Sequence, residues 1–100
     1  MIVSVLYPAG GTRFDLDYYM KKHIPLVKSR WEPLGLKKSE VLRCVGAPNG
    51  AGPYQLIALL TFGSMADFQN AAKQHGKEVL GDIPAFTDVE PVMQFNETLG

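Results

Sequence analysis

The chain has 100 residues and a mass of 11.0 kDa, so we expect residues 1–100 to form one small domain. Ten Lys and Arg residues balance ten Asp and Glu residues, and the formal net charge is zero. This balance argues against a nucleic-acid partner and against a polybasic membrane-binding surface.

Cysteine usage and hydrophobicity restrict the class of protein further. The only cysteine, Cys44, excludes an internal disulfide and a CxxC metal site. The longest apolar run, at residues 56–60, falls far short of the roughly 20 residues that span a bilayer. We therefore expect a cytoplasmic protein with no membrane partner.

The first half of the chain predicts a strand and a helix. Residues 2–8 are rich in β-branched and aromatic side chains and end in a Pro-Ala-Gly-Gly turn, which is typical of a strand. Apolar residues then recur every three to four positions between 15 and 30, as on one face of a helix. Pro25 lies inside this helix and predicts a kink near His23, which leaves the carbonyl of Tyr19 or Lys21 without its usual partner.

The second half predicts two strands, a helix and a last strand. Residues 39–48 alternate in polarity and lead into a glycine-rich turn, and residues 54–62 are apolar on both faces. Ser64 is a candidate N-cap for a helix that continues to Gly81. The run at 89–97 is expected to be an edge strand or to begin near Pro91, because proline cannot donate to a sheet.

The resulting order, βαββαβ, predicts a ferredoxin-like α+β fold with a four-stranded antiparallel sheet. Two helices cover only one face of such a sheet. Because residues 54–62 are apolar on both faces, the other face needs a cover of its own. We expect a homodimer in which two sheets pack together by two-fold symmetry.

His23 is the leading candidate for chemistry. It shares a helix face with Tyr19, and its ordinary pKa near about 6.5 allows it to exchange a proton at neutral pH. Asp82 or Asp88, in the loop that follows the second helix, offers a carboxylate to orient the imidazole. The alternatives are that His23 fills a half-buried gap and that Asp82 only stabilises a turn.

The expected pocket lies between the sheet and the helices. Phenol hydroxyls at the strand and helix ends would hold a carbonyl or enolate oxygen there, or would serve only in packing. The candidate ligand-binding residues are Leu6, Tyr7, Tyr54, Leu56, Phe62, Phe68, His75 and Phe86. A pocket of this composition predicts a small hydrophobic ligand.

Several kinds of site receive no support from the sequence. There is no GxGxxG, Walker A, GxSxG or HExxH motif. The two histidines have no acidic or thiol partners at a metal-ligand spacing, so we expect no metal and no cofactor. Haem ligation by His23 or His75 is a less favoured alternative.

Three segments carry a resemblance to a known family. VSVLYP at 3–8, FDLDYYMKKHIPLV at 14–27 and DIPAFTDVEPVMQ at 82–94 are similar to the EthD family, which is named for an ethyl tert-butyl ether degradation gene cluster. The family's HxP element corresponds to His23 and Pro25, and its Asp-x-Pro loop to Asp82 and Pro84. The resemblance implies a dimeric α+β barrel.

The function is expected to be binding of small aromatic or hydrophobic metabolites, in a degradation or biosynthesis pathway. If the protein is an enzyme, the expected chemistry is cofactor-free acid/base catalysis of the isomerase, lyase or oxygenase type, with His23 as proton-transfer group and Tyr19 and Asp82 assisting. The alternative is an accessory or ligand-binding protein without turnover. The sequence leaves open whether the protein is an enzyme.

Overall fold

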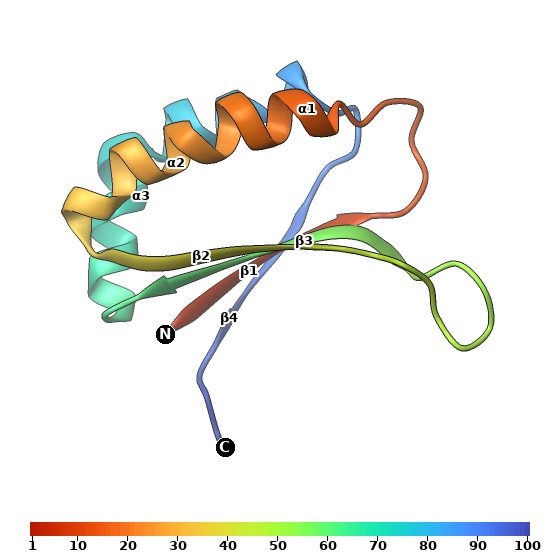
Figure 1. Cartoon of the computed structure of the whole chain (residues 1–100). Helices are drawn as coiled ribbons and strands as arrows, with labels where there is room; N and C mark the ends of the chain where they lie inside the picture. Colours follow the sequence, from red (N-terminus) through yellow and green to blue (C-terminus); the bar gives the residue numbers. More distant parts are fainter.

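A computed structural model describes the whole chain, residues 1–100, and it has the predicted order of strands and helices. Figure 1 shows one sheet with both long helical segments on the same face. The elements are β1 (Ile2–Pro8), α1 (Leu16–Tyr18), η1 (Tyr19–His23), α2 (Ile24–Trp31), η2 (Glu32–Leu34), β2 (Leu36–Arg43), β3 (Tyr54–Phe62), α3 (Met65–Gly81), η3 (Ile83–Ala85) and β4 (Val92–Asn96).

The sheet has four strands in the order β2-β3-β1-β4, and every neighbouring pair is antiparallel. The predicted ferredoxin-like fold is therefore confirmed. In β3, Leu56, Ala58, Leu60 and Phe62 are buried beneath the helices, and the residues between them are only half buried. Both helices lie on one side of β3, as expected, so its other face has no cover within the single chain.

The first helical segment contains a π-helical turn, η1, directly before Pro25. The backbone N–H of Ile24 donates to the carbonyl of Tyr19, five residues earlier. The expected kink is thus a wide helical turn. Contrary to expectation, the carbonyl of Tyr19 has a hydrogen-bond partner. Pro25 explains why the π-helical turn occurs at this position, because proline has no N–H to continue the ordinary α-helical hydrogen bonds.

The second helix, α3, begins and ends where the sequence predicts. The side chain of Ser64 accepts a hydrogen bond from the backbone N–H of Asp67, as expected of an N-cap. Phe68 and Ala71 on the buried face contact α2, where the indole N–H of Trp31 donates to the Ala71 carbonyl at 3.0 Å. This bond fixes the two helices against each other.

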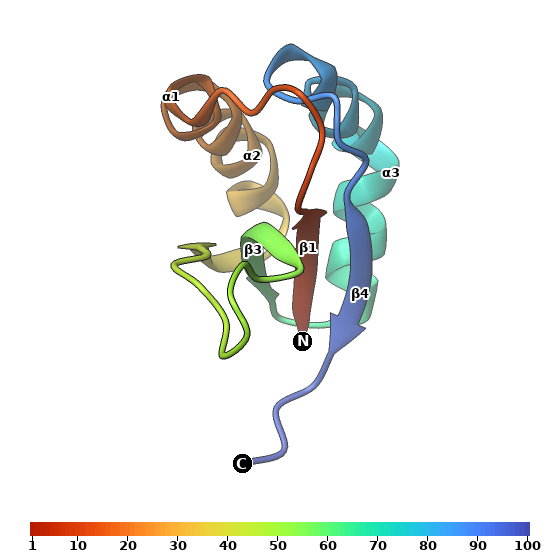
Figure 2. The same cartoon turned by 90° about the vertical axis from the view of Figure 1, so that its right-hand side faces the viewer.

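Two strand boundaries differ from the prediction. β2 covers Leu36–Arg43, not 39–48, because residues 44–53 form a loop closed by an isolated bridge between Ala47 and Gly50. β4 is the edge strand next to β1, and Pro91 lies just before it, as expected. Figure 2 shows β4 at this edge of the sheet, alongside α3.

The loop after β1 is fastened to the segment before β4. The carboxylate of Asp88 accepts hydrogen bonds from the backbone N–H of Thr12, at 2.9 Å, and from its hydroxyl, at 2.6 Å. The guanidinium of Arg13 donates to the carbonyls of Pro84 and Ala85. Gly11 has φ of +72°, and a Cβ there would lie 2.7 Å from Oδ1 of Asp88. Glycine is therefore required for this close approach.

None of the helices is both long enough and apolar enough to cross a membrane.

Candidate functional site

His23, inside the first helical segment, lies next to Asp82 at the end of the second. His23 is the last residue of η1 and is 4% exposed, and Asp82 follows α3 directly. Nδ1 of His23 and Oδ2 of Asp82 are 3.0 Å apart. The contact expected between the imidazole and a carboxylate of this loop is therefore present, and Asp82 makes it, whereas Asp88 holds Thr12.

Tyr18 completes the arrangement, and the sequence analysis did not select it. Its hydroxyl donates to Oδ1 of Asp82 at 2.8 Å, so each carboxylate oxygen has one partner. Tyr18 and His23 are five residues apart and point in different directions on an ordinary helix. The π-helical turn between them brings both side chains to the same carboxylate. The signal that predicts such a turn is Pro25.

Phe86 lies beneath this group and is fully buried. Its ring centroid is 4.7 Å from that of His23 and 5.0 Å from that of Tyr19. The Tyr19 ring also stacks on His23 with an angle of 26° between their planes. Packing on two sides, together with the bond to Asp82, therefore fixes the orientation of the imidazole.

Burial lowers the pKa of His23 below its ordinary value, and the hydrogen bond and charge of Asp82 oppose this effect only in part. His23 is therefore neutral at pH 7. With Asp82 as an acceptor, we assign the tautomer in which Nδ1–H donates to the carboxylate. Nε2 then carries a lone pair and has no partner within the chain.

Next to His23, a cavity of about 30 Å³ lies between the sheet and the helices. Its walls are apolar except for three side chains, Tyr7, Tyr19 and His23. The other lining residues are Val5, Ile24, Val27, Trp31, Ala58, Leu60, Val79, Leu80, Ile83 and Met93. None of these was predicted as a pocket residue, because their only sequence signal is apolar periodicity.

The hydroxyls of Tyr7 and Tyr19 are the other polar groups beside the cavity. Each residue is only 1% exposed, and both residues line the cavity. Burial raises the pKa of both phenols, so both stay protonated and able to donate. Tyr7 and Tyr19 therefore lie at the cavity with His23.

Other candidate ligand-binding residues lie elsewhere. Leu6 pairs with Ile57 and Val92 on the sheet face that the helices leave open. Tyr54 lines a separate hollow beside the 44–53 loop. His75 is partly exposed, 4.0 Å from Glu78 on the surface of α3, and does not reach the cavity. These three residues therefore do not line the cavity next to His23.

Three further candidates are buried on the helix side of the sheet but do not line the cavity. Phe62 and Phe68 form an aromatic cluster with Trp31, with ring centroids 5.4 to 5.9 Å apart. Leu56 belongs to the same hydrophobic core. Their role in this structure is packing. No group of three or more His, Cys, Asp or Glu side chains is placed to hold a metal ion.

The fold and the chain sequence are similar to those of solved structures. An EthD-like protein from Ralstonia eutropha JMP134 is 36% identical, with a TM-score of 0.83, and the match covers 93% of this chain and 86% of that one. The chain belongs to the EthD family. The resemblance seen in the sequence is thereby confirmed.

Two more distant structures share the fold of this EthD protein. An EthD family protein from Bacillus halodurans C-125 has a TM-score of 0.74 at 21% identity, covering 96% of this chain and 97% of that one. HapK from Hahella chejuensis has a TM-score of 0.60 at 11% identity, covering 100% and 96%. A scan against family models and a search of curated proteins each found no match.

Proposed function

We propose that this EthD protein binds a small hydrophobic molecule that carries a carbonyl or phenol oxygen, and that His23 moves a proton on it. The observation that supports this most directly is the state of the buried imidazole. Asp82 occupies Nδ1, whereas Nε2 has no partner within the chain, and His23 lines an apolar cavity. A neutral histidine held in this way is a general base.

The proposed step is proton transfer from a carbon next to a carbonyl. The C–H bond breaks, its proton forms the Nε2–H bond, and the electron pair moves onto the carbonyl oxygen as an enolate. A phenol hydroxyl of Tyr7 or Tyr19 donates a hydrogen bond to this oxygen. Nε2 then returns the proton to the same or to another carbon, so the step needs no added oxidant or cofactor.

Asp82 and Tyr18 support the base. As His23 gains a proton, the imidazolium faces the carboxylate 3.0 Å from Nδ1, which stabilises the new charge. The Tyr18 hydroxyl holds the other oxygen of Asp82 and prevents the carboxylate from turning away. Neither residue touches the substrate in this scheme, so both are positioning residues.

The test is hydrogen exchange in deuterated water. Aryl ketones, 1,3-diketones and lactones are incubated with the protein, and NMR follows the loss of the protons next to the carbonyl. We expect His23→Gln to reduce the exchange rate by about 10² to 10⁴. His75→Gln is the matched control, because His75 lies on the surface of α3. Equal rates in the wild type and His23→Gln contradict the proposal, and binding without exchange favours the accessory, ligand-binding alternative.

A second copy of the chain is proposed to cover the open face of the sheet. Cross-strand pairing places an apolar row across all four strands, formed by Val92, Leu6, Ile57 and Leu42. Leu42 and Val92 are about half exposed. Burying such a row against its own symmetry mate would remove it from water.

Light scattering tests the homodimer. Ile57→Asp should shift the mass from two chains to one, because the row would then carry a charge that cannot be paired. Val45→Asp, in the exposed 44–53 loop, is the control and should leave the mass unchanged. A wild-type protein that is monomeric at micromolar concentration contradicts this arrangement.

A further inference from the structure

The cavity beside His23 is too small for a metabolite. Its volume of about 30 Å³ corresponds to the volume that one water molecule occupies in the liquid. Binding sites for small organic molecules have volumes of about 300 to 1,000 Å³. A substrate that reaches Nε2 must therefore place most of its atoms outside this cavity.

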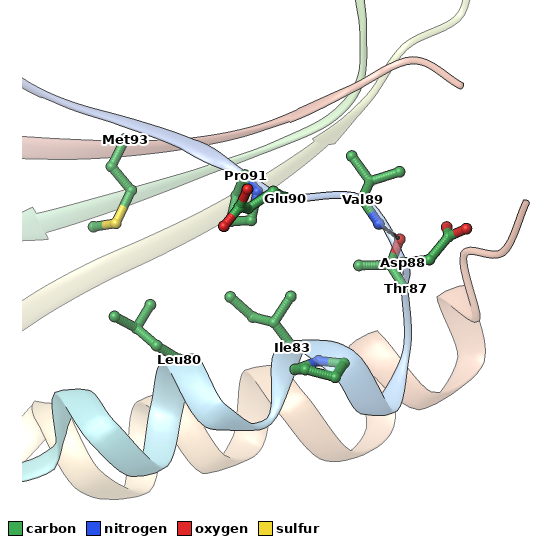
Figure 3. A pocket seen from close by; sticks show the side chains of 9 residues that line it. Leu80, Ile83, Thr87, Asp88, Val89, Glu90, Pro91 and Met93 are labelled. Carbon is green, nitrogen blue, oxygen red and sulfur yellow. Dashed lines mark hydrogen bonds between the residues drawn. The ribbon is translucent and has the colours of Figure 1, made fainter. Parts of the chain in front are cut away.

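A cleft of suitable size adjoins the cavity. It has a volume of about 540 Å³ and lies between the end of α3, η3 and the segment that leads into β4 (Figure 3). Leu80, Ile83 and Met93 line both the cleft and the cavity, so the two spaces meet at these three side chains. In Figure 3 the side chains of Leu80 and Ile83 point across the cleft toward the strand that carries Met93.

Two of the three side chains at this junction, Leu80 and Met93, are not members of the buried core. Leu80 is 46% exposed on the last turn of α3, and Met93 is on the edge strand β4. Methionine is unbranched and adapts to different shapes. A small rotation of these two side chains would enlarge the passage between the cleft and Nε2 of His23.

The side chains that line the cleft disfavour a negatively charged ligand. It is apolar next to the cavity, and its charged side chains are the carboxylates of Asp88 and Glu90. Hydrogen bonds from Thr12 lower the pKa of Asp88 to about 2, so its negative charge persists at pH 7. No Lys, Arg or His side chain lines the cleft. An anionic group there would meet two like charges among the side chains that line the cleft.

We infer that the substrate is a neutral, elongated molecule whose oxygen-bearing end reaches His23 while its apolar extension lies in the cleft between α3 and β4. Leu80 and Met93 at the junction determine which substrates pass. The inference rests on the proposed function for the identity of the reactive end. The length and the neutral charge of the substrate are inferred from the size, position and polarity of the cleft.

A series of 4-alkylphenols tests the inference by isothermal titration calorimetry. Phenol, 4-ethylphenol and 4-butylphenol present the same polar end with a growing apolar extension. In the wild type we expect the dissociation constant to fall about fourfold for each added methylene that enters the cleft. 4-(4-Hydroxyphenyl)butanoate, which adds a carboxylate to a similar extension, should bind about tenfold more weakly than 4-butylphenol.

Two tryptophan variants test whether the alkyl chain of the phenol lies in the cleft. Leu80→Trp fills the junction and should reduce the dependence on chain length to less than about twofold across the series. Leu99→Trp makes the same change at a position that is 91% exposed and should behave as the wild type. Leu80→Ala, which widens the junction, should preserve the dependence on chain length and so shows that the site tolerates substitution.

Four outcomes overturn the inference: no phenol binds, affinity does not change with chain length, Leu80→Trp keeps the full dependence, or only Leu80→Trp changes the mass in light scattering. The last result would mean that the cleft contacts another copy of the chain.

The hydrogen-exchange experiment separates this inference from the proposed function. Exchange that depends on His23 without any effect of chain length overturns the inference alone, whereas the expected chain-length effect without such exchange overturns only the catalysis.

Discussion

Nδ1 of His23 lies 3.0 Å from the carboxylate of Asp82, although 59 residues separate them in the sequence. The fold creates this pair by placing the ends of η1 and α3 on the same face of the sheet (Figure 1). Because His23 is buried and Asp82 is partly accessible, the pair combines a desolvated imidazole with a carboxylate that keeps some contact with water.

Replacing Asp82 should lower the pKa of His23 further. Burial lowers this pKa, and the bond and charge of Asp82 raise it, so removal of the charge leaves burial unopposed. In Asp82→Asn we therefore expect the NMR titration of the His23 ring protons to move to lower pH. The His75 resonances in the same spectra are the internal control. A titration that moves to higher pH contradicts the assignment of Asp82 as a carboxylate that stabilises the protonated ring.

The lowered pKa of His23 should make stability fall with acidification. The unfolded chain binds a proton to this residue near about pH 6.5, whereas the folded chain does so only at lower pH. Between these values the unfolded state holds more protons, so the free energy of unfolding decreases as the pH falls, by at most about 1.4 kcal/mol per pH unit. Urea unfolding at several pH values should show a shallower decrease in His23→Gln than in His75→Gln. Identical slopes would exclude this linkage.

Asp88 should stabilise the fold at neutral pH and lose this effect in acid. Hydrogen bonds from Thr12 and Arg13 lower its pKa from 3.8 to about 2. Its contribution is therefore complete above about pH 4 and disappears as the pH falls through about 2. We expect Asp88→Asn to lower Tm at pH 7 and the difference from the wild type to narrow below pH 4. Asp17→Asn, which removes an exposed carboxylate, should have little effect.

Phe86 should be among the most sensitive positions of the core. It is fully buried and contacts the rings of Tyr7, Tyr19 and His23. Truncation to alanine leaves a cavity, for which we expect a loss of about 3 to 5 kcal/mol in the free energy of unfolding. Phe95→Ala is the control, because Phe95 is 51% exposed on β4. Chemical denaturation that shows equal losses for both variants would contradict this ranking.

The elements that the sequence predicted well have strong local signals. β1, β3 and α3 match their predicted boundaries because alternation, helical periodicity and the Ser64 cap act over neighbouring residues. β2 was misplaced because it is an edge strand with charged residues at Lys37 and Lys38, and its pairing with β3 is a long-range property.

The candidate site was predicted only in part. His23 and Asp82 were selected because few side chains can exchange protons near neutral pH and because the loop after α3 carries carboxylates. Tyr18 was missed because its direction depends on the π-helical turn that follows it. Leu6 and Tyr7 were both expected at the pocket, but neighbouring residues of a strand point to opposite faces of the sheet, and only Tyr7 lines the cavity.

The sequence by itself determined the order of strands and helices, the fold class and the family resemblance, because hydrophobic periodicity and turn residues act over short stretches of chain. Only the tertiary structure decided which side chains meet: that Asp82 and not Asp88 holds His23, that Tyr7 and Tyr19 line the cavity, and that His75 does not. The reason is geometric. Contacts between residues about 60 positions apart depend on strand register, helix phase and the docking of α3 on the sheet. Patterns over a few neighbouring residues do not determine any of these.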